Sequence, residues 1–557
     1  MSSFGPEHPT EQPDGPEQGD DGAPSPGLPT LPPRVSISTS PPWTDSQAAS
    51  GQPGQPGQPG PASQSGQPGQ ALPYGASSMA PYMVPASPRA GRLKRLLLPL
   101  LVLALVGGGV AVLFRDRLFP SSGGPAYPKE WDPRVADLAT FVAGERDLSW
   151  VHPVFVDFLT EAEFVALFDP STTQPTAEAT AAAASRSLLY NAFGLAGDYD
   201  ATQGEASVSA VTTLGFYSVD TDRVYVRGDQ LTPAVQVVLA HELTHALQAQ
   251  HFDLSVEGAD DLELRAIVEA DALRVENVYR ATLPAVDRAA ADEGNSLAPE
   301  AEADLDGVPW AVVEERYAPY VLGPTLVADV FATDGNSGVD SLIRTPPTEE
   351  VLLNPWLKGT EQREEPVTVT VPDGATVIDE PQALSELDML LMLDAWLPWR
   401  QARNALEGWA GGGYASYDQD GKVCFTASAS FDQSGDLFAK AITDWAAAAG
   451  STAVPVVIVN DVTFEACARG ATAAEPEKPV ISPLQALSLE HDVIALAGSG
   501  ASQDKIDKYR CFAGTMIDDP LLAPLIYLDT RTTDEQALFT WQSTIAANAC
   551  GVPPLTP

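Results

Sequence analysis

The chain has 557 residues, with 75 Asp and Glu against 31 Lys and Arg, which gives a net charge of −44. This length exceeds what a single hydrophobic core usually serves, so it predicts two or three folded units. The acidic balance repels phosphate backbones, and we therefore expect no nucleic-acid partner.

Residues 1–90 differ in composition from the rest of the chain. They are rich in Pro, Gly, Gln and Ser and include the run GQPGQPGQPG at 51–60. Almost nothing in this segment can bury apolar surface, so ordering it would not offset the entropy lost. The composition predicts a disordered tail.

Residues 91–117 are predicted to form a single membrane-spanning helix with basic flanks. The stretch Leu96–Phe114 has 19 residues without a charge, enough to cross a bilayer. Basic residues are more numerous before it than just after it: Arg89, Arg92, Lys94 and Arg95 precede it, and Arg115 and Arg117 follow. The positive-inside rule then places the tail in the cytoplasm and everything after 117 outside the cell.

A linker at 118–130 leads into a predicted folded domain at 131–365. Helical spacing covers 132–148, a strand pattern covers 152–159, and an Ala-rich helix is expected at 175–195. The alternation at 215–229 predicts a hairpin with Val224 and Val226 on one face.

The next segment predicts a buried helix from Ala234 to Gln250. Thr232 is a suitable N-cap, and Pro233 suits the first helical position. The residues up to Ala240 are apolar nearly all round, yet two histidines and an acid follow in the middle of the helix. Burying such groups without partners is costly, so a compensating partner is expected.

That partner is predicted to be a metal ion. His241 and His245 are four residues apart, so they share one helix face and both imidazoles can reach one ion. Glu242 is rotated by about 100° from His241, which lets it hold a water molecule instead of binding the metal. HExxH is the short motif of zinc peptidases. The alternative is a helix with two histidines that have ordinary hydrogen-bond partners.

Two residues compete as the third ligand. His251 follows His245 by six residues, a spacing at which a third histidine ligand can occur. An unbroken helix through Gln248, however, leaves His251 about 120° away from the ligand face. Glu269 belongs to a predicted helix at 260–280. It lies on the apolar stripe of that helix, formed by Leu262, Ala266, Ala270 and Leu273. We therefore expect Glu269 to bind the metal and His251 to be a helix-end residue.

Alternatives remain open around Glu269. Its partner could instead be Arg265, one turn earlier, in a salt bridge. Glu263 is exposed on the same helical wheel and is a poorer candidate. Asp271 cannot share the face of Glu269. Two roles are open for it: contacting the ligands from behind, or fixing the backbone.

The segment GFYSVDTDRVYVRGDQLTPAVQVVLAHELTHALQAQHFDL, followed by RAIVEADAL, resembles gluzincin-type, thermolysin-like metallopeptidases. The nearest likeness is to a poorly characterised bacterial group with an HExxHALQxQHFDL helix, and it covers roughly 131–360. The resemblance implies a zincin-like fold, zinc ligands at His241, His245 and Glu269, and Glu242 as the base. Two positions depart from that group: Ala270 replaces its usual Gly, and Asn354 stands where a His often precedes Pro355.

A second α+β domain is predicted at 366–557. It should contain a long helix at 384–410, a hairpin at 411–431, a helix at 432–449 and a strand at 454–460. No chemical constellation stands out there, and the isolated His491 is expected at the surface.

This C-terminal domain also holds every cysteine of the chain: Cys424, Cys467, Cys511 and Cys550. No pair has CxxC spacing, which argues against zinc ribbons and redox motifs. An even number in an exported region predicts two disulfides, with three possible pairings. Four free thiols are the alternative, and they would require the opposite orientation in the membrane.

These features together predict an α+β, membrane-anchored, extracellular zinc metallopeptidase that hydrolyses peptides or proteins. Zn²⁺ would lower the pKa of a bound water, and Glu242 would take its proton. Tyr217, Tyr225 and Tyr279 are near in sequence as donors to an oxyanion, and nothing selects one of them. The alternative is a non-catalytic surface protein with a partner-binding role or a closed structural zinc site, in which His251 would be the fourth ligand.

Overall fold

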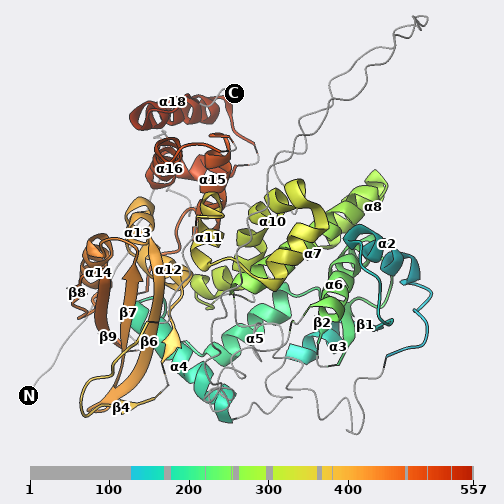
Figure 1. Cartoon of the computed structure of the whole chain (residues 1–557), viewed down its shortest axis with the longest axis horizontal. Coiled ribbons are helices and arrows are strands. Elements are labelled where there is room, and N and C mark those ends of the chain that lie inside the picture. Colours follow the sequence, from blue (N-terminus) through green and yellow to red (C-terminus); the bar gives the residue numbers. More distant parts are fainter. Residues whose placement is uncertain are drawn as a thin grey trace, which may run out of the picture. The chain divides into compact units, whose positions relative to one another are not determined.

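The computed structural model describes residues 127–168, 177–197, 199–219, 221–252, 254, 262–295, 305, 307–360, 367–378, 381–470, 475–498, 500–528 and 530–554. The predicted tail at 1–90 and the predicted membrane span at 91–117 lie outside these residues. Among the helices in the described ranges, none is long and apolar enough to cross a membrane. The mixed α+β class is confirmed (Figure 1).

A small mixed sheet follows the first helix of the described chain. Its strands are β1 (Phe155–Leu159), β2 (Gly215–Ser218) and β3 (Arg223–Arg227), in the order β1-β3-β2. β3 pairs in parallel with β1 and antiparallel with β2, so β2 is an edge strand. Val224 and Val226 are both fully buried, which confirms the predicted inner face of the hairpin.

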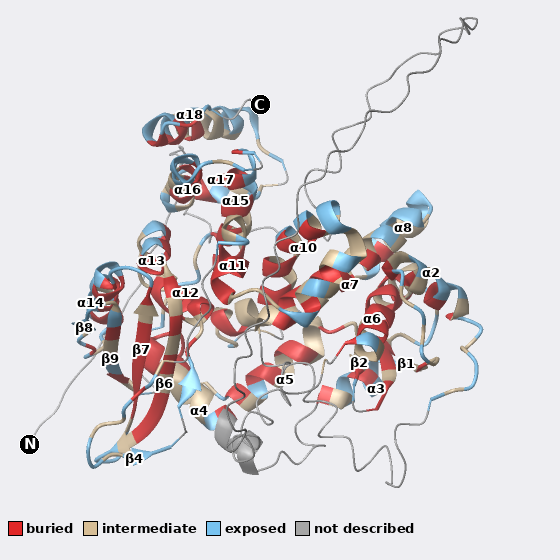
Figure 2. Ribbon diagram, in the orientation of Figure 1, coloured by how far each residue is buried: buried red, intermediate tan, exposed pale blue. Residues whose placement is uncertain are grey.

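Helix α6 (Pro233–His251) packs against this sheet. Its start is as predicted, because the Thr232 hydroxyl accepts the Val235 N–H and Pro233 is the first helical residue. α6 also contacts helices α2 (Ala136–Arg146), α7 (Leu262–Thr282) and α8 (Ala285–Gly294). It is therefore buried over most of its length, including the segment with the two histidines (Figure 2).

Helix α10 (Trp310–Arg344) packs closely along α7. A Cβ at Gly323 would lie 1.9 Å from the Ala266 carbonyl oxygen and 2.9 Å from the Ala270 Cβ. The two helices thus meet backbone to backbone, one turn before Glu269. α10 is broken at Gly335, whose φ of 60° and ψ of −155° are not helical.

The second sheet has the order β4-β6-β7-β9-β8, with β5 also paired to β6. Its strands are β4 (Thr376–Val377), β5 (Gln382–Ala383), β6 (Trp409–Gln419), β7 (Lys422–Phe431), β8 (Val456–Ile458) and β9 (Asp461–Cys467). The predicted hairpin is the β6–β7 pair, and the predicted strand at 454–460 is the short edge strand β8.

The single long helix predicted at 384–410 is wrong. The segment forms two helices, α12 (Glu386–Asp394) and α13 (Trp399–Ala405), and its last residues begin β6. Pro398 stands between the helices and caps the start of α13. Proline lacks an N–H and disfavours helical geometry in the residue before it, which explains the break.

The remaining helices complete the described chain. They are α3 (Glu161–Val165), η3 (Ala166–Phe168), α4 (Ala177–Phe193), α5 (Ala201–Thr212), α11 (Glu349–Leu353), η4 (Pro355–Leu357), α14 (Asp436–Ala449), α15 (Pro483–Ala495), α16 (Gln503–Asp518), α17 (Ala523–Ile526) and α18 (Thr533–Cys550). α4 packs on β7 and β9, so one hydrophobic cluster contains residues from both sides of position 365.

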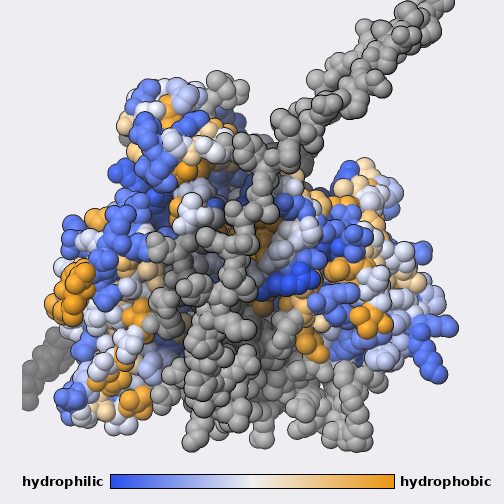
Figure 3. Space-filling model, in the orientation of Figure 1, coloured by the Kyte–Doolittle hydropathy of each residue, from blue (hydrophilic) through white to orange (hydrophobic). Residues whose placement is uncertain are grey.

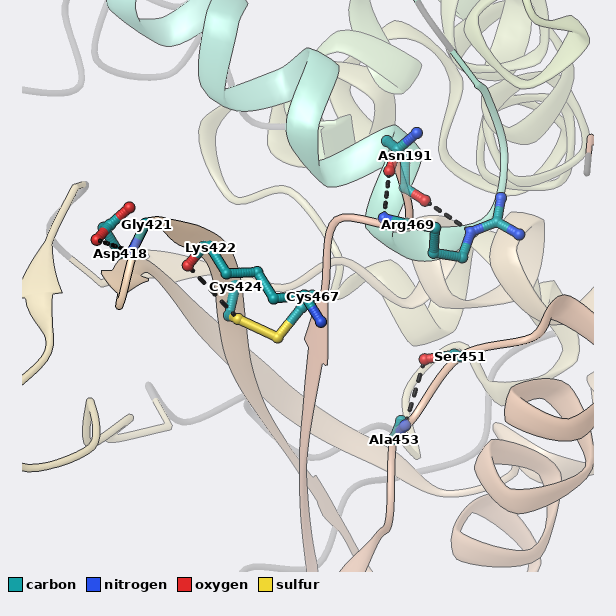
Figure 4. The surroundings of a disulfide bond; sticks show 9 residues. All are labelled: Asn191, Asp418, Gly421, Lys422, Cys424, Ser451, Ala453, Cys467 and Arg469. Carbon is teal, nitrogen blue, oxygen red and sulfur yellow. Dashed lines mark hydrogen bonds between the residues drawn. A yellow bond between two sulfur atoms is a disulfide. The ribbon is translucent and has the colours of Figure 1, made fainter. Parts of the chain in front are cut away.

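All four cysteines form disulfides, as predicted. Cys424 of β7 pairs with Cys467 of β9, and Cys511 of α16 pairs with Cys550 of α18. Figure 4 shows the first disulfide between neighbouring strands, and near it the Arg469 backbone N–H donating to the Asn191 side chain. That contact joins α4 to the chain just after β9.

The edge of the second sheet carries apolar surface. Five aliphatic side chains around β8 are 40% to 84% exposed: Val454, Val456, Val457, Ile458 and Val459. Figure 3 shows this surface as orange atoms at the left of the molecule.

Candidate metal centre

Three side-chain atoms from α6 and α7 converge. The Nε2 atoms of His241 and His245 are 3.0 Å apart, and the Glu269 Oε2 atom lies 3.0 Å from the first and 3.2 Å from the second. The three residues form a group that could hold a metal ion. The sequence predicted these three ligands, and the fold brings them together.

The outer nitrogen of each imidazole is already engaged. His241 Nδ1 lies 2.9 Å from a carboxylate oxygen of Glu276, which can only accept, so this nitrogen carries the proton. His245 Nδ1 lies 2.9 Å from Oε1 of Gln248. Both rings then turn their Nε2 atoms toward Glu269.

The orientation of the Gln248 amide follows from its other contacts. Its Nε2 donates to the Val268 carbonyl at 3.1 Å and to the Asp271 carboxylate at 2.8 Å. Both partners are acceptors, so the amide oxygen has to face His245. The Nδ1 of His245 must therefore donate, and this ring also presents an Nε2 lone pair when it is neutral.

Asp271 is completely buried behind this amide. It forms ion pairs with Arg146 at 2.7 Å and Arg274 at 3.1 Å, besides accepting from Gln248. Asp271 therefore acts from behind the ligands, because it contacts Gln248 and Gln248 in turn contacts the His245 ring. Two cations next to it keep this carboxylate compensated in the protein interior.

The three converging atoms fit a metal ion chemically. Two imidazole lone pairs and a carboxylate oxygen at 3.0–3.2 Å repel one another unless a cation, either protons or a metal, lies between them. Zinc bonds of about 2.0–2.1 Å in a tetrahedral site separate neighbouring ligand atoms by roughly 3.3 Å, close to the spacing observed. Nitrogen and oxygen donors of this kind suit zinc.

The pKa values of the ligands reflect the same convergence. Burial by itself lowers the pKa of His241 and His245, but the carboxylates around them together outweigh it: Glu269 and Glu242 at both rings, and Glu276 at His241 as well. The pKa is raised for His245 and raised well above its usual value for His241. Burial opposes ionisation of Glu269, yet the two histidines hold the pKa of this carboxyl well below its ordinary value.

Glu242 lies beside the group without joining it. Burial raises the pKa of its carboxyl, against the opposing effect of the two histidines and of a hydrogen bond from the Tyr217 backbone N–H. β2 approaches Glu242 closely because residue 215 is glycine. A Cβ there would lie 2.7 Å from Val238 Cγ1 and 3.2 Å from Glu242 Cγ.

The three tyrosines near in sequence do not turn their hydroxyls to the metal group. The Tyr217 hydroxyl donates to Asp222, the Tyr279 hydroxyl donates to Gln236, and Tyr225 packs in a separate apolar cluster. A fourth, Tyr320 of α10, stacks on the His241 ring with 6.2 Å between ring centroids. Burial and the charges of Glu269 and Glu242 raise the pKa of its phenol.

His251 and His491, the two other histidines considered in the sequence, lie elsewhere. His251 ends α6 and contacts the Ser149 carbonyl oxygen at 2.7 Å, away from the metal group. His491, expected at the surface, is buried, and its Nε2 lies 3.0 Å from the Leu353 carbonyl oxygen. That expectation was wrong because α15 packs between other elements, which a short sequence window does not reveal.

Sequence reasoning missed Glu276, Gln248 and Tyr320. Glu276 follows Glu269 by seven residues, nearly two full helical turns, and this spacing could have placed it on the same face. Tyr320 is far away in sequence and carries no comparable signal. In comparisons with known proteins, no family model, curated protein or solved structure matches this chain.

Proposed function

We propose that the protein is a zinc-dependent peptidase that hydrolyses peptide bonds at the group formed by His241, His245 and Glu269. The observation that carries the proposal is the convergence of three ligand atoms beside a buried acid, Glu242, which is not one of them. A zinc ion at this site would supply Lewis acidity and lower the pKa of water toward neutrality.

Glu242 is the proton carrier in this proposal. A raised carboxyl pKa suits a general base, since catalytic efficiency is greatest when the pKa is close to the working pH. Glu242 takes a proton from the attacking water and gives it to the amine that leaves. The Tyr217 backbone N–H holds the carboxylate during this exchange.

Tyr320 is the donor that we assign to the developing oxyanion. Its ring lies against His241, and it is near both Glu242 and Glu269. A phenol with a raised pKa keeps its proton at neutral pH and can donate a hydrogen bond. β2 supports the peptide specificity, because an edge strand beside the base can pair with an extended substrate.

The number of ligands favours catalysis over a structural zinc site. Structural sites are usually closed by four protein ligands, whereas catalytic sites keep one position open. In the described ranges only three residues form the group, and His251 is engaged with Ser149.

The proposal also includes a membrane-anchored, extracellular location, which rests on the sequence pattern of residues 91–117.

The proposal is tested with purified full-length protein and a quenched-fluorescent peptide library. We expect hydrolysis that a zinc chelator abolishes and added zinc restores. Glu242→Gln should keep one zinc per chain and lose at least about 100-fold in turnover, the scale of general acid–base catalysis. A zinc-loaded wild-type protein that cleaves nothing, or a Glu242→Gln variant of full activity, would contradict the proposal.

A further inference from the structure

Arg316 lies close to the proposed catalytic site, and among the described residues its guanidinium forms one hydrogen bond. Its Nη2 donates to the Thr213 hydroxyl at 3.3 Å, and its Nε is buried without a hydrogen-bond partner. No Asp or Glu carboxylate of the described ranges comes within 4.0 Å of this guanidinium.

Two chain segments place Arg316 at the site. On α10 it precedes Tyr320 by four residues, so both side chains share one helix face, and Tyr320 stacks on His241. Across from it, Thr213 precedes Gly215 by two residues, and Gly215 is where β2 meets Glu242. The guanidinium therefore lies between the helix that carries Tyr320 and the start of the edge strand.

The electrostatics agree with this placement. Burial raises the pKa of Tyr317 and Tyr320, and the positive charge of Arg316 opposes this rise at both phenols, as expected for a guanidinium near them. The site otherwise holds the carboxylates of Glu242 and Glu269, which repel an anionic ligand. Arg316 is a cation that can offset this repulsion, and Arg265, whose charge also acts on Tyr320, has further interactions of its own.

We propose that Arg316 is a specificity-determining residue that binds a carboxylate of the peptide substrate. The planar guanidinium has paired N–H donors that match a carboxylate in a bidentate arrangement. The carboxylate is either the C-terminus of the substrate or an Asp or Glu side chain next to the scissile bond. This inference rests on the proposed peptidase function and names its substrate class.

The test uses two pairs of malonyl-hydroxamate dipeptides, whose hydroxamate anchors each compound on zinc. One pair is Leu-Ala with a free C-terminal carboxylate and its carboxamide. The other is Leu-Asp amide and Leu-Asn amide, which tests a side-chain carboxylate. Dissociation constants are measured by calorimetry on zinc-loaded full-length protein, with zinc content determined first.

We expect the acid of at least one pair to bind about 10- to 100-fold more tightly than its neutral partner, as for a charged hydrogen bond. Arg316→Met should abolish this preference, and Arg316→Lys should keep part of it, because lysine retains the charge but not the paired donors. Arg344→Met, on the same helix and mostly exposed, is the matched control and should keep the full preference.

Two results would overturn the inference: wild-type protein that binds acids and amides equally, or an acid preference that survives in Arg316→Met. If Arg316→Met does not fold, Arg316→Lys decides by the same comparison. A protein that takes up no zinc, or binds none of the four hydroxamates, would instead contradict the proposed peptidase function.

Discussion

The amide oxygen of Gln248 faces Nδ1 of His245 at 2.9 Å, and the same amide donates to Asp271 on its other side. A chain of contacts thus runs from the buried Asp271 to a ligand of the candidate metal centre. Such contacts behind a metal ligand fix the orientation of the ring and its proton position, and losing one typically weakens metal binding by about 10- to 100-fold.

Gln248→Met should therefore weaken zinc binding by about 10- to 100-fold, because methionine has a similar shape but cannot accept from His245 or donate to Asp271. Zinc affinity is measured by competition with a chromophoric chelator. Gln250→Met is the matched control on the same helix, since Gln250 bonds to residues 151 and 152 and not to the metal group. Equal zinc affinity in Gln248→Met and wild type would show that this contact does not orient His245.

The close approach of β2 to Glu242 gives a second prediction. Gly215→Ala adds a methyl group 2.7 Å from Val238 Cγ1 and 3.2 Å from Glu242 Cγ, so β2 or the Val238 side chain must shift and the Glu242 side chain is crowded. A displacement of about 1 Å can cost on the order of 100-fold in rate. We expect turnover to fall by roughly that factor while zinc content stays at the wild-type level.

Gly144→Ala serves as the control for this substitution. Gly144 is in helix α2, and a Cβ there meets nothing within 4 Å, so the change should leave activity intact. If the Gly215→Ala variant turned over peptide as fast as the Gly144→Ala variant, the exact position of Glu242 against β2 would be unimportant for the reaction.

The raised pKa values of His241 and His245 predict a pH-dependent competition between protons and zinc. In the metal-free protein these rings keep their protons above the usual histidine pKa, and zinc has to displace them. Zinc affinity should therefore rise steadily with pH across the neutral range and level off only above the raised values. Calorimetric titrations in buffers of different ionisation enthalpy measure both the affinity and the protons released.

The same shifts set the stability of the metal-free protein. The histidine contribution is fully present below about pH 6.5 and is lost as the pH rises through the raised values. The Glu269 contribution is present above about pH 4.5 and is lost as the pH falls through its lowered value. The increase in Tm caused by zinc should thus grow from pH 6 to pH 8; a constant increase would contradict the assigned ligands.

Much of the site could be predicted from sequence because its ligands obey helical periodicity. The four-residue step between His241 and His245, and the apolar stripe around Glu269, each follow from the geometry of one helix. The N-cap at Thr232 and the exclusion of His251 have the same local origin. The structure places all of these residues as expected.

The parts that could not be predicted depend on contacts between distant segments. In the sequence Gln248 stands out only as a position where the helix is unbroken, and its bond to Asp271 exists because α6 and α7 pack side by side. Arg316 and Tyr320 enter the site from α10, where Gly323 allows close contact with α7. No periodic pattern within one helix encodes which face of another helix it will meet.

The central claim is that His241, His245 and Glu269 hold a zinc ion, and zinc X-ray absorption spectroscopy on the full-length protein tests it most directly. We predict two imidazole ligands with the remaining positions filled by oxygen, at zinc–nitrogen and zinc–oxygen distances of about 2.0–2.2 Å. Glu269→Ala should lose its zinc at micromolar metal, while His251→Ala should keep both the zinc and the two-imidazole spectrum. A third imidazole in the wild-type spectrum, together with zinc lost from His251→Ala and retained by Glu269→Ala, would contradict the account.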